Sequence, residues 1–170
     1  MLDAPAPATL DAAPPPTLDE VRALHDDYVE CLDDVRLDDW PGFFTEACLY
    51  RVIPRENHEA GYGLCTMQAE SRGMLRDRVT GLLKTQVFAP RTYRRFVTNA
   101  RVKGHGPEGT RVRSNVLVVQ TLLDQPSEVV LCGTALDLLR RDAATGRLLF
   151  AERVVVMDGE MVPNSLVYPA

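Results

Sequence analysis

The second half of the chain restricts the possible folds more than any other feature of the sequence. Four stretches rich in Val, Leu and Thr follow Pro90, and short runs of turn residues separate each stretch from the next. The stretches span residues 94–102, 112–122, 129–140 and 148–157, and the connections span residues 104–107, 124–126 and 142–146. Extended segments joined by turns that contain Gly, Pro and Asp are typical of consecutive β-hairpins. This half therefore predicts an antiparallel meander of four strands.

The first long helix is predicted directly after Thr17 or Asp19, either of which can cap a helix. Apolar residues recur at helical spacing behind these caps: Val21, Leu24, Tyr28, Cys31, Leu32 and Val35. Acidic residues occupy the opposite side: Asp26, Asp27, Glu30, Asp33 and Asp34. This pattern predicts a strongly amphipathic helix whose acidic side faces solvent.

The second long helix is predicted over residues 67–86, where Leu75, Val79, Leu82 and Leu83 recur at helical spacing. Three shorter segments connect the two long helices. Residues 38–44 predict a short helix, residues 48–53 predict a short strand that stops at Pro54, and residues 55–63 predict a loop.

Two helices followed by a long-stranded meander are the element order of an α+β protein. We predict a cone-shaped, curved antiparallel sheet closed by the N-terminal helices. Residues 112–122 offer Leu117 and Val119 to one face of the sheet and Val116 and Val118 to the other. A strand that is apolar on both faces needs a cover on each side. Because the sequence contains no third long helix, the second cover is predicted to be another subunit.

Length and composition set the domain organisation and exclude several classes of protein. Residues 1–17 contain five prolines and five alanines, which predicts an extended or disordered tail before a single domain at 18–170. The formal net charge of −5 argues against nucleic-acid binding. The first residues show neither a basic stretch nor an apolar run, and eighteen consecutive apolar residues occur nowhere in the sequence, so we expect neither secretion nor membrane spanning.

The four cysteines indicate a cytoplasmic location. Cys31, Cys48, Cys65 and Cys132 are scattered within apolar stretches and form no C-x-x-C pair. Such residues are typical of small buried hydrophobes in a reducing cytosol, so all four are predicted to be buried and free.

Motifs for metal, nucleotide or nucleophilic chemistry are missing from the sequence. His25, His58 and His105 do not follow the H-x-x-x-H, C-x-H or C-x-x-H spacings of zinc, mononuclear iron or Rieske sites. The G-x-G-x-x-G pattern at 104–109 contains Pro107 and precedes no helix, so it indicates a hairpin turn and not a dinucleotide site. No catalytic, cofactor-binding or metal-binding residue is therefore predicted.

One catalytic alternative stays open at this point. A conical sheet closed by helices can enclose a buried acid–base pair, and Asp38 or Asp39 with His58 and Tyr28 could transfer protons there. The chain would then be a stand-alone isomerase, dehydratase or cyclase. The competing interpretation is that both aspartates are helix caps and His58 is an ordinary loop residue.

Four segments have the order and spacing of a known family: residues 39–46, 50–52, 70–79 and 94–99. The pattern Ser71-x-x-Met74-Leu75-x-x-Arg78 is the most specific of them. Together they resemble the small (β) subunit of bacterial aromatic-ring-hydroxylating (Rieske non-haem iron) dioxygenases over roughly residues 18–170. The W-x-x-F-F segment before the Y-x-V strand is similar to the wider nuclear transport factor 2-like superfamily, which includes scytalone dehydratase and has a cystatin-like cone fold.

This resemblance implies a non-catalytic structural β subunit in aromatic hydrocarbon catabolism. The partner α subunit would carry the Rieske 2Fe-2S cluster and the mononuclear iron, and would largely determine the substrate. The β subunits would form a trimer under three α subunits, giving a hetero-hexamer that a reductase or ferredoxin supplies with electrons. An oxidoreductase complex of this kind would work without an active site in this chain.

The candidate interface residues are five arginines: Arg72, Arg76, Arg78, Arg94 and Arg95. Arginine accounts for 17 of the 19 cationic residues, and a guanidinium makes two-pronged contacts with carboxylates. Some of these contacts are expected across subunit boundaries. Pairing inside one subunit, with Asp77 or Glu70, is the alternative.

Overall fold

The computed structural model describes residues 14–85, 87–162 and 166–170. Its elements are, in chain order, α1 (Leu18–Asp33), the 3-10 helix η1 (Trp40–Phe43), β1 (Phe44–Pro54), α2 (Arg55–Glu59), β2 (Met67–Ala69), α3 (Arg72–Lys84), β3 (Arg91–Gly106), β4 (Gly109–Leu122), β5 (Glu128–Arg141) and β6 (Leu148–Met157). All four strands predicted after Pro90 are present, as β3 to β6. The G-x-G-x-x-G pattern lies in the β3–β4 hairpin, as its context predicted.

Helix α1 begins where the sequence predicted. The Thr17 side chain accepts a hydrogen bond from the Glu20 backbone N–H, and the Glu20 carboxylate accepts one from the Thr17 backbone N–H. This reciprocal capping box satisfies two donors that a helix start otherwise leaves free. Only Val35 departs from the predicted apolar side, because the helix ends at Asp33 and Val35 has a positive φ of 58° with 45% of its surface exposed.

The sheet has six strands in the order β2-β1-β6-β5-β4-β3. The pairs β3–β4, β4–β5 and β5–β6 are antiparallel, which confirms the meander. The pair β1–β6 is parallel, so the sheet is mixed and not wholly antiparallel. The physical reason is that β1 and β6 are far apart in the sequence, so no tight turn sets their relative direction.

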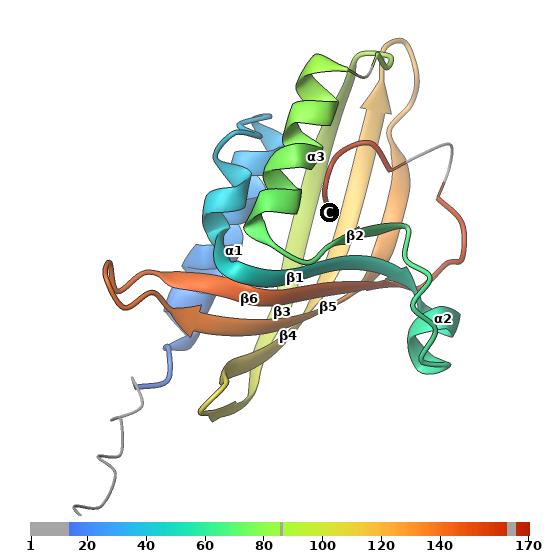
Figure 1. Ribbon diagram of the computed structural model, residues 1–170. Coiled ribbons are helices and arrows are strands. Elements are labelled where there is room, and N and C mark those ends of the chain that lie inside the picture. The colour runs from blue at the N-terminus through green and yellow to red at the C-terminus, as the bar shows by residue number, and fades with distance from the viewer. Residues whose placement is uncertain (1–13, 86, 163–165) are drawn as a thin grey trace, which may run out of the picture.

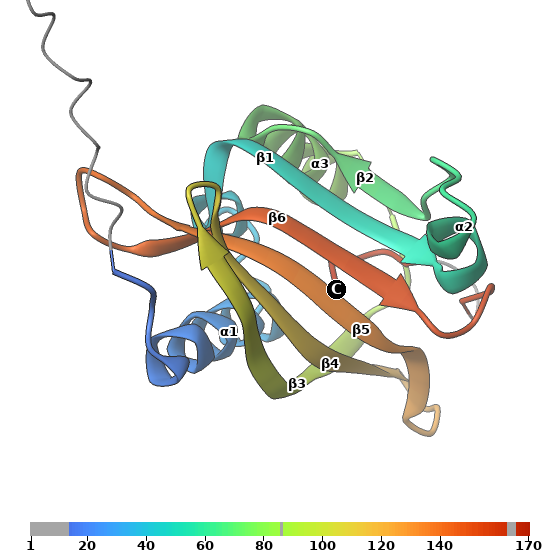
Figure 2. The ribbon, with the colours of Figure 1, turned by 90° about the horizontal axis from the view of Figure 1, so that it is seen from below.

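Helices α1 and α3 lie on one side of the curved sheet (Figure 1). Seen from below, the opposite side of the sheet faces the viewer, with the short helix α2 at one end of it (Figure 2). The core lies between the helices and the sheet, and its aromatic centre consists of Tyr28, Trp40, Phe44, Tyr50 and Phe150. These rings meet mostly edge to face, the arrangement that aromatic side chains prefer. The predicted α+β cone is therefore confirmed.

Three local predictions were wrong in part. Met67–Ala69 is the strand β2 and not the start of a helix, because Met67 and Ala69 alternate into the core and the segment pairs with β1. Helix α3 starts after Ser71, whose hydroxyl accepts a hydrogen bond from the Met74 backbone N–H. Residues 55–59 are the helix α2 and not loop, and the short helix predicted at 38–44 is the 3-10 turn Trp40–Phe43.

The predicted tail at 1–17 lies outside the described residues except for residues 14–17, which have neither helix nor strand. In the part of the chain that the structure describes, no helix is long and apolar enough to cross a membrane.

Candidate functional site: the closed cone interior and the open sheet face

The cone interior contains a buried ion pair. Asp137 of β5 and Arg153 of β6 are cross-strand partners in the antiparallel pair, and the side chains of both are 0% exposed. Arg153 Nη1 donates to Asp137 Oδ1 at 3.0 Å and to Oδ2 at 2.9 Å. Charged groups become this deeply buried only when they are paired and hydrogen-bonded. This pair therefore fixes the register of β5 against β6 inside the core.

His25 of α1 joins the same carboxylate. Its Nε2 lies 2.9 Å from Asp137 Oδ2, and its ring stacks on Phe150 with 6.0 Å between centroids. Because an ionised carboxylate can only accept hydrogen bonds, His25 Nε2 is the donor in this contact. The contact ties helix α1 to the middle of the sheet.

Aromatic rings surround the buried guanidinium of Arg153. Its central carbon lies 4.6 Å from the centroid of Tyr28 and 4.9 Å from that of Phe150, within cation–π range. Burial alone would lower the pKa of Arg153, but Asp137 and the neighbouring tyrosines outweigh burial and raise it. Burial raises the pKa of Tyr28 and of Tyr50. Arg153 is thus held as a cation and the two phenols as neutral donors and acceptors.

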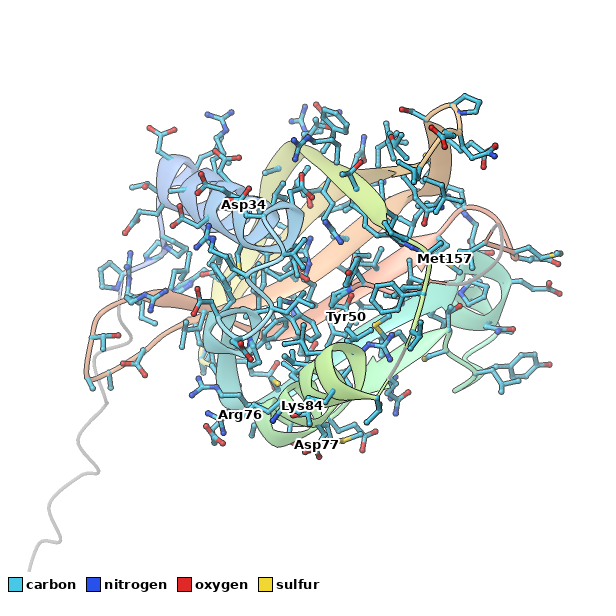
Figure 3. The ribbon with its side chains drawn as sticks, turned by 90° about the horizontal axis from the view of Figure 1, so that it is seen from above. Asp34, Tyr50, Arg76, Asp77, Lys84 and Met157 are labelled. Atoms are coloured by element: carbon cyan, nitrogen blue, oxygen red, sulfur yellow. The ribbon has the colours of Figure 1, made fainter. Side chains whose placement is uncertain are left out.

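The last residues of the sequence fill the interior between α3 and the sheet. Tyr28 OH accepts from Trp40 Nε1 at 3.2 Å and donates to the Ala170 carbonyl oxygen at 2.7 Å. Ala170 N–H donates to Tyr50 OH at 2.8 Å. In the view from above, Tyr50 lies near the centre of the molecule, between α1 and α3 (Figure 3). These polar groups hold the protein's own chain, whereas other buried polar atoms of the interior, His25 Nδ1 and Arg153 Nε and Nη2 among them, have no hydrogen-bond partner in the described residues.

Arg95 and Arg78 hold the same segment from two further elements. Arg95 Nε and Nη2 donate to the Pro169 carbonyl oxygen at 3.1 and 2.6 Å, while Nη1 contacts Asp33 at 2.5 Å. Arg78 Nη2 donates to the Val167 carbonyl oxygen at 3.3 Å, and burial lowers the pKa of Arg78. Together with the tyrosines, α1, β1, α3 and β3 each supply a side chain that grips residues 166–170.

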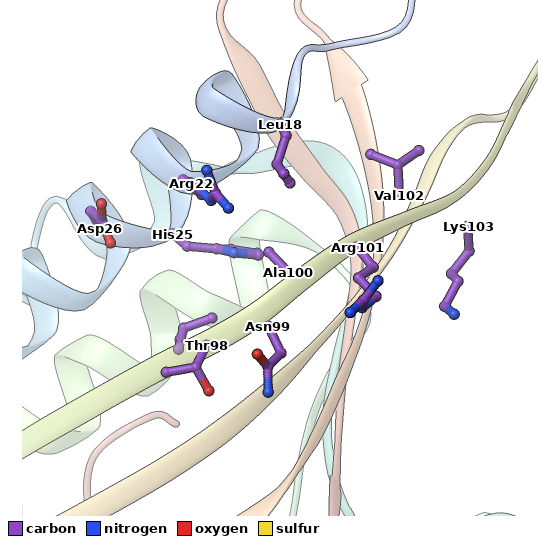
Figure 4. Close-up of a pocket in the computed structure, with 11 residues that line it drawn as sticks. Leu18, Arg22, His25, Asp26, Thr98, Asn99, Ala100, Arg101, Val102 and Lys103 are labelled. Atoms are coloured by element: carbon purple, nitrogen blue, oxygen red, sulfur yellow. The ribbon is translucent and has the colours of Figure 1, made fainter.

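A groove of about 760 Å³ runs between α1 and β3 on the outside of this interior. The side chains of Leu18 and Arg22 border it on the helix, and residues 97–103 border it on the strand (Figure 4). His25 reaches across from α1 toward β3 at its base. Since His25 is 2% exposed, the groove leads to the interior network without opening it to solvent.

The opposite side of the sheet is open. We define the open sheet face by the side chains of β3, β4 and β5 that point away from the helices: Arg94, Phe96, Thr98, Arg101, Arg113, Asn115, Leu117, Val119, Cys132 and Thr134. Phe96 is 50% exposed, whereas Val116 and Val118 on the inner side of β4 are 2% and 1% exposed. Leu117 and Val119 are half-buried. The prediction that β4 is apolar on both faces is confirmed, and the residues that the structure describes cover only the inner face fully.

The five candidate interface arginines do not form one cluster. Three of them contact the chain's own backbone: Arg72 donates to Phe44, Arg78 to Val167 and Arg95 to Pro169. Four of the five arginines also have a carboxylate partner inside the chain. Glu46 pairs with Arg72 and Arg76, and Asp33 pairs with Arg94 and Arg95. These are not the predicted alternatives Asp77 and Glu70. Arg76 and Arg94 expose 60% and 68% of their side chains, so the interface prediction applies most directly to these two.

The residues of the acid–base alternative do not converge. Asp38 and Asp39 are exposed and border a surface hollow near η1, whereas His58 is exposed on α2 and does not line that hollow. Tyr28 is inside the core, bonded to Trp40 and Ala170. The residues of the catalytic alternative therefore do not form one site.

The cysteines and the possible metal ligands are distributed as follows. Cys31 and Cys48 are buried, and burial raises the pKa of the Cys31 thiol to about 11. Cys65 is half-buried and Cys132 is exposed on the open sheet face, so burial of all four cysteines was predicted wrongly. In the described ranges, no three His, Cys, Asp or Glu side chains stand close enough together to hold a metal ion.

The interior network was missed because its members are far apart in the sequence. A signal existed: Asp137 alternates with Ala135 and Leu139, and Arg153 alternates with Ala151 and Val155. A charged residue on the apolar side of a strand indicates a buried, paired charge. His25 also lies on the apolar side of its helix, next to Leu24 and four residues after Val21, which indicates burial, but no local pattern connects it to Asp137.

The comparisons with known proteins agree on one family. Residues 28–164 match the family model described as "Ring hydroxylating beta subunit". The chain is 30% identical over 150 residues to the anthranilate 1,2-dioxygenase small subunit of Burkholderia cepacia, a match that covers 88% of this chain and 92% of that relative. It is 25% identical to the β 1 subunit of the terminal oxygenase component of terephthalate 1,2-dioxygenase from Comamonas, over 88% of this chain and 96% of that relative.

A solved structure gives the same result. A protein assigned as the β subunit of an aromatic-ring-hydroxylating dioxygenase from Novosphingobium aromaticivorans superposes with a TM-score of 0.79 at 29% identity. That match covers 89% of this chain and 95% of the other. The β subunit of benzoate 1,2-dioxygenase from Burkholderia mallei shares the fold with a TM-score of 0.68 at 14% identity, over 84% of this chain and 91% of that one.

Proposed function

Because this chain belongs to the ring-hydroxylating β-subunit family, we propose that it is the structural, non-catalytic subunit of a multicomponent aromatic-ring-hydroxylating dioxygenase. The observation that carries this proposal is the contrast between its two surfaces. The interior is occupied by the chain's own residues 166–170, which four elements hold through Tyr28, Tyr50, Arg78 and Arg95. The open sheet face, by contrast, leaves Phe96 half exposed for a partner.

The partner in this proposal is a catalytic α subunit. The relatives are named as the small subunit of anthranilate 1,2-dioxygenase and as subunit beta 1 of the terminal oxygenase component of terephthalate 1,2-dioxygenase, and these names support an α partner for this chain. We propose three α and three β subunits per complex, with the β subunits forming a trimer. The Rieske 2Fe-2S cluster and the mononuclear iron would lie in α, where they supply electron transfer and dioxygen activation. A reductase or ferredoxin would deliver the electrons.

The role of this chain is then to hold α subunits in a stable assembly. Candidate interface residues are Arg76 and Arg94, whose exposed guanidiniums can bind carboxylates of a neighbour. Arg72, Arg78 and Arg95 act by shaping the surface from within, because they hold the chain's own backbone. We place the complex in the cytoplasm, in the catabolism of aromatic compounds.

The test is coexpression with the product of a neighbouring open reading frame that contains C-x-H and C-x-x-H spaced for a Rieske centre. We expect the two subunits to copurify at equal stoichiometry, with a mass that fits three of each. Iron should be present in the complex and absent from this chain purified alone. An α subunit that is equally stable and active without this chain would overturn the proposal. So would a well-behaved monomer of this chain that does not bind α.

A further inference from the structure

The open sheet face brings two like charges directly opposite each other. Arg101 of β3 and Arg113 of β4 are cross-strand partners, and both are exposed. Among the described residues neither has a carboxylate within ion-pair distance, whereas the nearby Arg111 is paired with Glu108. Like charges in directly opposed positions destabilise a sheet. The isolated chain thus carries a local repulsion that an external carboxylate would relieve.

Next to these guanidiniums the same face is hollowed. The hollow has a volume of about 400 Å³, and its apolar part consists of Phe96, Leu117 and Cys132. Arg113 lies at its border, and Asp158 with its partner Arg55 also lines it. Apolar and aromatic side chains in a concavity with arginines at the border are typical of the energetic centre of a protein interface.

We propose that this hollow is the docking site of the catalytic α subunit, which inserts an apolar side chain between Phe96 and Leu117 and presents carboxylates to Arg101 and Arg113. This inference rests on the proposed function and adds the surface and the chemistry of the contact. The arginines provide orientation and charge specificity, and the apolar hollow provides most of the binding energy.

A second copy of this chain fits the hollow less well. A two-fold symmetric contact through this face would bring the Arg101–Arg113 pair of one copy against the same pair of the other, and the charges would repel. The acidic side of α1 could meet the arginines of a neighbouring copy. Between Asp19 and Glu30 that side presents no exposed large hydrophobic side chain, and the exposed Leu18 and Val35 lie beyond the two ends of this acidic stretch, so its middle has nothing to fill the hollow.

Cys132 provides a native probe, because its thiol is exposed in the hollow. The full chain, alone and in complex with the coexpressed α subunit, is treated with a maleimide and mapped by peptide mass spectrometry, with the half-buried Cys65 as reference. Burial and the neighbouring Asp158 raise the pKa of the Cys132 thiol, so labelling is followed at mildly alkaline pH in both samples. We expect Cys132 to be labelled in the chain alone and at least about tenfold more slowly in the complex. Equal labelling in both samples would overturn the inference, as would protection of Cys132 already in the chain alone, which would assign the hollow to a second copy.

Two substitutions test the chemistry of the contact. Phe96→Ser and Arg113→Glu, each in the full chain, are expected to weaken binding to α by about tenfold or more. The matched control Arg147→Glu reverses an exposed charge in the β5–β6 turn and should bind as the wild type does. Circular dichroism and thermal melting of each variant alone verify that the fold is intact. If both variants bind α normally, the docking site is wrong while the proposed function stands; if the wild type itself does not bind α, the proposed function fails.

Discussion

Two cross-strand pairs in one sheet show how differently the inner and outer faces are built. On the inner face, Asp137 and Arg153 stand opposite each other with opposite charges, and both side chains are 0% exposed. On the outer face, Arg101 and Arg113 stand opposite each other with the same charge, and both are exposed. Both are cross-strand pairs, but the outer pair lies between two register irregularities of β3 and β4. The inner pair has its counter-charge within the chain, although Arg153 Nε and Nη2 lack hydrogen-bond partners, whereas no described carboxylate lies within ion-pair distance of the outer pair. The inner face thus serves stability, and the outer face is the association surface that we propose.

The strongest way to break this comparison is to remove the inner carboxylate. Asp137→Asn leaves the Arg153 guanidinium buried without a counter-charge, and His25 loses its anionic acceptor. Removing one partner of a buried pair costs about 3–5 kcal/mol, so we expect the free energy of unfolding to fall by about that amount. Urea unfolding followed by circular dichroism measures it. The control Asp26→Asn, on an exposed position of α1, should be within about 0.5 kcal/mol of wild type.

The second test removes one hydroxyl from the grip on the C-terminal segment. Tyr50→Phe leaves the Ala170 N–H buried without its acceptor, which costs about 1–3 kcal/mol. Hydrogen–deuterium exchange of residues 166–170 should become faster while the exchange of β4 and β5 stays unchanged. Tyr62→Phe, at a position that is 62% exposed, is the matched control. Unchanged exchange at Ala170 in the Tyr50 variant would contradict the role assigned to this hydroxyl.

A smaller loss of stability is expected from a substitution at the start of α1. Thr17→Ala removes the side chain that accepts from the Glu20 N–H, and loss of such a cap costs about 1 kcal/mol. Thermal melting at constant pH measures the loss. Thr17→Ser keeps the acceptor and should melt close to wild type, and equal losses in both variants would exclude the capping explanation.

The other half of this capping box, the Glu20 carboxylate, should make the stability of the protein depend on pH. The Thr17 backbone N–H and the Arg141 side chain hold the pKa of the Glu20 carboxyl below its ordinary value of 4.5. A carboxyl with a lowered folded-state pKa contributes stability above its unfolded pKa, and this stability is lost as the pH falls through the folded pKa. The difference in melting temperature between wild type and Glu20→Gln should therefore be largest near neutral pH. It should shrink progressively as the pH falls below 4.5. Because the Glu20–Arg141 ion pair is partly exposed to solvent, added salt should also reduce this difference in melting temperature.

The smallest change in stability is expected on the open sheet face, where the substitution should stabilise the chain instead of destabilising it. Arg101→Gln removes one of the two facing charges, so the isolated chain should become more stable by about 0.2–0.5 kcal/mol at low salt. The gain should vanish at high ionic strength. Chemical denaturation at two salt concentrations measures it. A destabilised variant would mean that the two guanidiniums do not repel each other in the folded chain.

The parts of the fold that were predictable depend on local patterns. Val21, Leu24 and Tyr28 lie within one amphipathic helix, and the alternation of Val116, Leu117 and Val118 lies within one strand, so neighbouring residues carry the signal. The short strand β2 was not predictable, because its three residues are strand only by pairing with β1. The same limit applies to the site. His25 and Asp137 are 112 residues apart, and no local pattern connects them.

The parallel pair β1–β6 also limits when the sheet can finish folding. Tyr50 pairs with Arg153, about a hundred residues further along the chain, so β1 lacks this neighbour until β6 has been synthesised. Contacts of such long sequence separation slow folding and leave apolar strand edges exposed in the meantime. We therefore expect slow refolding from denaturant, and a nascent chain that depends on protection from aggregation until its last strand emerges from the ribosome.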